Sequence, residues 1–160
     1  MHLRNFPAGM AVLLCLSPLP ATAIAAVASQ KDAAEIASYR LSMDVAHKVE
    51  AAALAMQRGF EAAGEDEPDL FDEDEDLDDS VASLEGNPIT SAALRSAGIS
   101  AREFMSFLTC WAQTALYAQF AQSGKAENMP LKVLPENLQF VADHAEELDA
   151  MRREWKEDED

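Results

Sequence analysis

The sequence predicts an all-α protein, folded as a small bundle of three to four helices with a central apolar helix near residues 101–122 and a disordered acidic insert. Alanine is abundant, and apolar residues recur at spacings of three and four, the periodicity of one helical face. Signals for helix starts recur along the chain. Sustained alternation of apolar and polar residues, which indicates a half-buried strand, does not occur in the 160 residues.

The first long helix is predicted from Ser42 to Phe60, and the pattern is also compatible with an earlier turn from Asp32. One face is formed by residues spaced three or four apart: Leu41, Val45, Val49, Ala52, Met56 and Phe60. Ser42 is suited to the N-cap position, and Asp44 places a negative charge where the helix dipole favours it. Residues 29–64 therefore form the first helical region.

An acidic run follows this region. Eleven of the fifteen residues from Glu65 to Asp79 are Asp or Glu, and no Lys or Arg lies between Arg58 and Arg95. The run has too few apolar residues to offset the entropic cost of ordering it. We therefore expect residues 65–79 to be a disordered insert, followed at most by a short helical turn up to Glu85.

A short helix is predicted to follow the insert. Pro88 favours its first turn, and Gly98 is suited to the position just after its end. Ser100 and Glu103 then match a capping box, which places the start of the next helix at Ala101.

The helix over residues 101–122 is the predicted centre of the bundle. No charged residue occurs from Phe104 to Gly124, and apolar residues lie on nearly every side. A helix of this kind either spans a membrane or lies inside a bundle. Its Gln and Thr side chains favour the bundle.

The last helix is predicted to start near Pro135 or Asn137 and to continue to Trp155. Its apolar face comprises Leu138, Val141, Ala145, Leu148, Met151 and Trp155. Residues 80–156 would then form a helical unit that completes one domain with residues 29–64.

Residues 1–28 have the pattern of a secretory signal peptide. Arg4 precedes an apolar stretch, and small residues follow it, with cleavage expected near Ala26 or Ala28. An uncleaved anchor is the less favoured alternative, because the apolar stretch is shorter than the roughly 20 residues that a membrane span needs. The sequence thus predicts a periplasmic or secreted protein with no membrane span after cleavage.

The chain carries a formal net charge of −17. We expect no nucleic-acid partner, because binding to phosphates depends on Lys and Arg. Cys15 would leave with the signal peptide, so Cys110 has no partner for an internal disulfide. Burial of Cys110 in its apolar helix is favoured over a disulfide between two chains.

Three groups of residues contain side chains that could carry chemistry. Asp44, His47 and Glu50 lie on one side of the first helix, as do Asp143, His144 and Glu147 on the last one. Either set contains metal ligands, but a solvated polar face is the favoured interpretation. A nucleophile would need Cys110 beside one of these histidines, and nothing in the sequence brings them together. We therefore expect no enzyme, no cofactor and no assigned catalytic or metal-binding residue.

The acidic run allows a different function. Asp74, Asp76, Asp78 and Glu85 match positions 1, 3, 5 and 12 of an EF-hand loop, but Asp79 occupies the position that needs glycine. Low-affinity binding of divalent cations by the insert is therefore the alternative function, without a specific calcium loop.

Three stretches of the sequence resemble an uncharacterised group of exported, alanine-rich helical proteins of Gram-negative bacteria. They are Tyr39–Asp44, Ala97–Phe104 and Pro135–Val141. The group has no known activity, so the resemblance implies no catalytic residue. The expected function is that of an exported, soluble and non-catalytic protein that acts through contacts with another envelope protein in the periplasm.

Overall fold

The computed structural model describes residues 30–65, 76–124 and 132–154, and these residues form seven α-helices and no strand. In chain order they are α1 (Gln30–Ser38), α2 (Met43–Ala63), α3 (Leu77–Gly86), α4 (Pro88–Ala97), α5 (Ala101–Gln122), α6 (Pro135–Asp143) and α7 (Ala145–Glu154). The predicted all-α class is confirmed, but three to four helices was too low a count. The predicted signal peptide and residues 66–75 of the predicted disordered insert lie outside the described residues.

Two predicted helical regions are each divided into two helices. Residues 39–42 form an extended linker between α1 and α2, and Ser42 itself has extended backbone angles (φ −149°, ψ 151°). The last helix is interrupted at His144 (φ −112°, ψ 19°), which separates α6 from α7. The break also changes the predicted apolar face, because Ala145 is exposed whereas Leu148 and Met151 are buried.

The predicted helix starts and ends depend on local capping and are largely confirmed. The Ser42 hydroxyl accepts a hydrogen bond from the Val45 N–H (3.4 Å), and the Ser100 hydroxyl accepts one from the Glu103 N–H (3.1 Å). Gly64 and Gly98 follow α2 and α4 with φ of 68° at both positions, a conformation that glycine adopts without steric cost.

Helix α3 replaces the short turn expected before Glu85. Its N-cap is Asp76, whose carboxylate accepts a hydrogen bond from the Asp79 N–H (2.9 Å). Leu77, Val81 and Leu84 are buried at helical spacing. The predicted end of the disordered insert at residue 79 is therefore wrong, because residues 77–79 belong to this helix.

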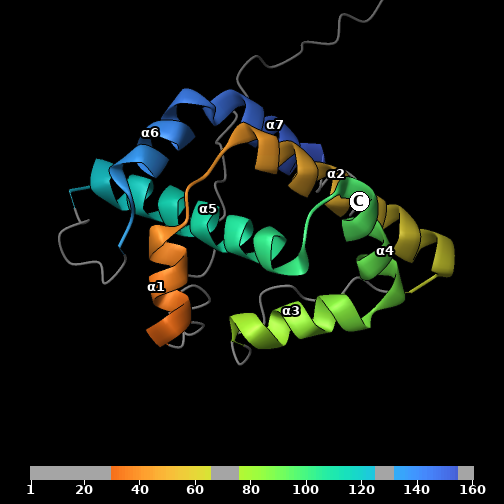
Figure 1. The fold of residues 1–160 in the computed structure, drawn as a ribbon. Helices are drawn as coiled ribbons and strands as arrows, with labels where there is room; N and C mark the ends of the chain where they lie inside the picture. Colours follow the sequence, from red (N-terminus) through yellow and green to blue (C-terminus); the bar gives the residue numbers. More distant parts are fainter. Residues whose placement is uncertain (1–29, 66–75, 125–131, 155–160) are drawn as a thin grey trace, which may run out of the picture.

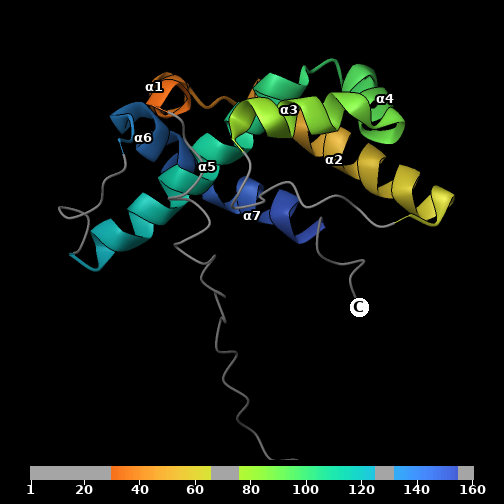
Figure 2. The same cartoon turned by 90° about the horizontal axis from the view of Figure 1, so that it is seen from below.

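Helix α5 lies at the centre of the arrangement, with α1, α2, α3 and α6 packed against it (Figures 1 and 2). Its N-terminal half is the main contributor to the core, where Phe104 and Phe107 are each 1% exposed. Helices α2 and α4 pack on each other, and Val49 and Ala52 of α2 have no exposed surface.

Arg102 joins three helices on one side of the core. From α5, its guanidinium pairs with Glu35 of α1 (3.1 Å) and with Asp78 of α3. The hydrogen bond to Asp78, followed by that to Glu35, raises the pKa of Arg102 above its ordinary value. Ser106 adds a hydrogen bond from its hydroxyl to the same Glu35 carboxylate (3.3 Å).

Gly59 allows α2 and α4 to approach closely. A Cβ atom at this position would collide with Cγ2 of Ile89 on α4. We therefore predict that Gly59→Ala destabilises the protein by about 1–3 kcal/mol, although alanine favours a helix by about 1 kcal/mol. Urea denaturation measures the free energy of unfolding.

The matched control places the same change in an Ile89→Ala background, which lacks the colliding methyl group. There Gly59→Ala should stabilise the protein by up to about 1 kcal/mol. Equal destabilisation in both backgrounds would mean that a collision with Ile89 is not the reason why alanine is unfavourable at position 59.

Candidate functional site

The C-terminal part of α5 is less buried than the predicted central helix should be. Thr114 is its last buried residue, and every later residue of α5 is half-buried or exposed. Leu116 and Phe120 lie one turn apart and are half-buried, as are Leu134 and Leu138 at the start of α6. None of these four side chains belongs to the core cluster or is packed against it. We call these four residues the α5–α6 surface.

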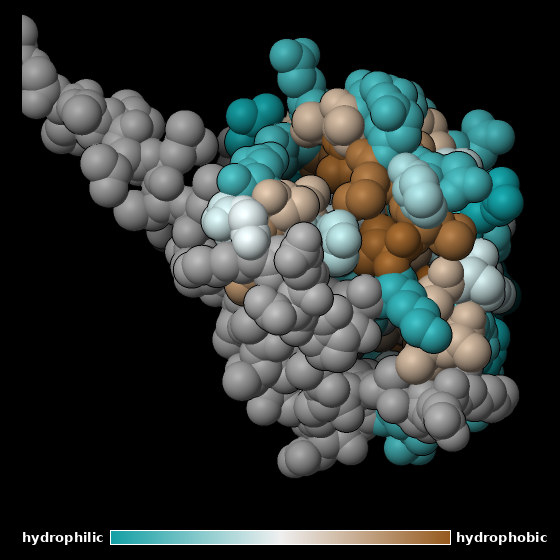
Figure 3. Space-filling model, turned by 90° about the vertical axis from the view of Figure 1, so that its left-hand side faces the viewer, coloured by the Kyte–Doolittle hydropathy of each residue, from teal (hydrophilic) through white to brown (hydrophobic). Residues whose placement is uncertain are grey.

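The figures show how this surface arises. The hydrogen bonds and ion pairs of α1 and α3 with α5 are made at Arg102 and Ser106, and the linker after α1 contacts Cys110, all in the N-terminal half of α5. The C-terminal part of α5 extends beyond these two helices, and α6 packs against α5 (Figures 1 and 2). At this end of the molecule hydrophobic residues gather and are bordered by hydrophilic ones (Figure 3). None of the helices in the described part of the chain is long and apolar enough to cross a membrane.

Asn137 is the main polar residue beneath this end and is 2% exposed. Its Oδ1 accepts a hydrogen bond from the Leu41 N–H (3.0 Å), and its Nδ2 donates to the Tyr39 carbonyl (2.8 Å). Nδ2 also donates to the Sγ of Cys110 (3.2 Å). One amide thus holds the extended linker of residues 39–42 against α5 and α6. Asn137 was predicted only as a possible helix start, and its neighbours Pro135, Glu136 and Gln139 give no signal that it is buried.

Cys110 is buried, as predicted, in contact with this amide. Its Sγ also lies 3.7 Å from the Tyr39 carbonyl oxygen, to which it donates. Burial raises the pKa of the Cys110 thiol, and interactions with Thr114 and Asn137 partly oppose this shift. The group is therefore a protonated thiol at neutral pH, and a thiolate is the form that acts as a nucleophile.

The two histidines meet elsewhere, at Glu147. His47 Nε2 lies 3.1 Å from one carboxylate oxygen, and His144 Nδ1 lies 3.6 Å from the other. His47 of the first predicted polar face therefore contacts Glu147 of the second, although the two residues are 100 positions apart in the sequence. All three side chains are between 37% and 55% exposed, so these contacts contribute little to stability. Cys110 and the histidines have different hydrogen-bonding partners.

The EF-hand pattern does not form a calcium loop in the described residues. Asp76 caps α3, Asp78 pairs with Arg102, and Glu85 lies within the helix. Positions that should surround a calcium ion are therefore arranged along a helix instead of around a loop. Asp74 lies outside the described residues, and weak cation binding by the acidic insert stays a prediction.

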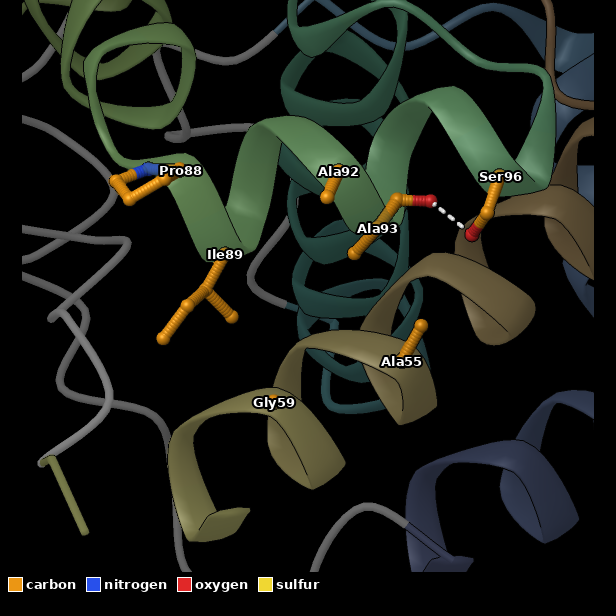
Figure 4. A pocket seen from close by; sticks show the side chains of 7 residues that line it. All are labelled: Ala55, Gly59, Pro88, Ile89, Ala92, Ala93 and Ser96. Carbon is orange, nitrogen blue, oxygen red and sulfur yellow. Dashed lines mark hydrogen bonds between the residues drawn. The ribbon is translucent and has the colours of Figure 1, made fainter. Parts of the chain in front are cut away.

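A shallow apolar hollow lies between α2 and α4 (Figure 4). Its volume is about 500 Å³, and its lining consists of Ala55, Gly59, Pro88, Ile89, Ala92, Ala93 and Ser96. The Ser96 hydroxyl donates to the carbonyl of Ala93 (2.7 Å), so its hydrogen is already used within the helix. The lining therefore offers little polar chemistry to orient a ligand.

Among residues 30–65, 76–124 and 132–154, no group of three or more His, Cys, Asp or Glu side chains is placed to hold a metal ion. Comparison of the chain with protein-family models, with curated proteins and with solved structures gave no match. The α5–α6 surface and the buried Asn137 cluster are therefore the features on which a function can be argued.

Asn137→Leu tests the buried amide. The change leaves the Leu41 N–H without a partner and the Tyr39 carbonyl with only the weak thiol donor of Cys110, and a buried group that loses its partner costs about 1–3 kcal/mol. We expect a loss of about 2–5 kcal/mol in the free energy of unfolding, measured by urea denaturation. Gln139→Leu, at an exposed position of the same helix, should change it by less than about 0.5 kcal/mol. Similar effects of the two changes would contradict the role of Asn137.

The raised pKa of the Tyr39 hydroxyl predicts how the free energy of unfolding changes at alkaline pH. Burial, followed by the charges of Glu103 and Cys110, raises the pKa of Tyr39 from 10.0 to about 12. A raised pKa stabilises the folded state fully below the unfolded value, and this stabilisation is lost as the pH rises through the folded value. The free energy of unfolding should therefore fall between pH 10 and about 12. This decrease in the free energy of unfolding should be smaller in Tyr39→Phe. An unchanged decrease would mean that other groups cause the pH dependence.

Proposed function

We propose that this chain is an exported, soluble helical protein without catalytic activity, which acts in the periplasm by binding another protein through the α5–α6 surface. We further propose that it belongs with the exported, alanine-rich helical proteins that it resembles. The observation that carries the binding proposal is that Leu116, Phe120, Leu134 and Leu138 are only partly buried and lie outside the core cluster.

Physical reasoning supports a protein contact at this surface. Full burial of a Leu or Phe side chain is worth about 1.5–3 kcal/mol, so completing the burial of one that is already mostly buried gains at most about 1 kcal/mol. Four such side chains gain at most about 4 kcal/mol before the entropic cost of association is subtracted. A partner must therefore add favourable interactions at the border of the surface to bind with useful affinity.

The chemistry of the cluster around Cys110 supports a role without catalysis. The thiol is buried, its pKa is raised, and it contacts an amide and a carbonyl. A cysteine nucleophile is normally activated by a neighbouring base, and the histidines contact Glu147 instead. Export is supported by the sequence pattern of residues 1–28 alone.

Site-specific photo-crosslinking in cells tests the proposal. A photoreactive residue replaces Gln119, which is exposed on α5 next to the surface, and a control carries it at Ala92, exposed on α4. We expect the chain in the periplasmic fraction, cleaved near Ala26 or Ala28, and one discrete crosslinked protein with the probe at 119 only. Identical crosslinks at both positions, or a chain that stays in the cytoplasm with Met1 intact, would reject it.

A further inference from the structure

Helices α6 and α7 follow each other in the chain but are secured to the core in different ways. We infer that α7 is a detachable strap, which opens as a unit at His144 while α6 stays in place. Opening uncovers the core surface that Leu148 and Met151 cover. The device does not depend on a partner at the α5–α6 surface.

The anchoring of α7 depends on two apolar side chains. Of residues 145–153, Leu148 (2% exposed) and Met151 (5%) are buried, Ala150 is half-buried and the others are exposed. Glu147 adds an ion pair with His47 of α2 (3.1 Å), but both side chains are about half exposed to water, which weakens the pair. Segments with few buried apolar contacts are those that open at a low free energy.

Helix α6 is held by buried polar and apolar contacts together. Asn137 forms hydrogen bonds with the linker of residues 39–42 and with Cys110. Phe140 and Val141 pack against the core cluster. Departure of α6 would leave buried polar groups of the linker without their partners, which is costly. Helix α6 therefore stays docked under conditions in which α7 opens.

The boundary between the two helices lies at His144. Its backbone angles (φ −112°, ψ 19°) are outside the α-helical region, and residues at the end of an element can absorb the rotation of a hinge. Its imidazole packs on Phe140 with the ring centroids 4.9 Å apart, which keeps His144 with α6. Helix α7 has 10 residues, and isolated helices shorter than about 12–15 residues are marginal in water. Opening therefore unfolds α7 and exposes its amides.

Hydrogen exchange of the backbone amides, followed by nuclear magnetic resonance in increasing urea, tests the inference. After correction for intrinsic rates, amides of residues 148–153 should exchange about tenfold or more faster than those of residues 104–114. Their exchange should also depend less on urea, because the opening of α7 exposes less surface than global unfolding. Amides of residues 138–143 in α6 should not share the faster exchange.

Variants separate the opening of α7 from unfolding of the whole protein. Leu148→Ala removes an anchor and should accelerate exchange in α7 about 30-fold or more. The matched control Glu146→Ala, at an exposed position of α7, should change it less than about threefold. Asn137→Leu should accelerate exchange in α5 and leave that of α7 unchanged, because α6 is docked in both the closed and the open state. Phe107→Leu in the core gives the same comparison if Asn137→Leu does not fold.

Several results would overturn the inference. Equal rates and equal urea dependence in α7 and α5 would mean that α7 opens only when the whole protein unfolds. Fast exchange shared by α6, or acceleration of α7 by Asn137→Leu, would mean that the opening unit does not begin at His144. Fast exchange of α7 that does not respond to Leu148→Ala would be fraying of a chain end, without a strap that opens as a unit.

Discussion

The buried amide of Asn137 is the constraint on which the arrangement of the first two helices depends. It satisfies the backbone on either side of Arg40, at the Tyr39 carbonyl and the Leu41 N–H, and it contacts Cys110 of α5. A buried linker without secondary structure has polar groups that need partners, and burial without them is costly. Because one amide both donates and accepts, it allows the linker to enter the core and lets α1 and α2 run in different directions.

Helix α5 combines two roles along its length. Its N-terminal half supplies the two most buried phenylalanines and carries Arg102, which pairs with α1 and α3. Its C-terminal half continues the same uncharged composition beyond those helices. Partly exposed apolar residues favour self-association of a free protein in solution. The net charge of −17 counteracts self-association, so such a surface is compatible with a monomeric chain.

The sequence was most informative where structure depends on neighbouring residues. The caps at Ser42 and Ser100 and the glycine at 98 follow from hydrogen bonds or backbone angles within one turn, and the sequence predicted them. Contacts between distant residues were not. The linker before α2 depends on an amide almost one hundred positions later, and Glu147 joins His47 to His144 across two helices. Periodicity indicated that α5 is apolar on all sides, but only packing decides which half is covered.

The distance in sequence between α1 and its partners determines when this helix can take its place during synthesis. Glu35 meets Arg102 and Ser106, which lie 67 and 71 residues later, and the linker meets Asn137 after 96 to 98 residues. Contacts at such separations close only after the intervening chain is present, and they slow folding. Of the helices in the described residues, α1 is made first, yet it is among the last to complete its tertiary contacts. Until the start of α6 has been made, the growing chain cannot complete its core.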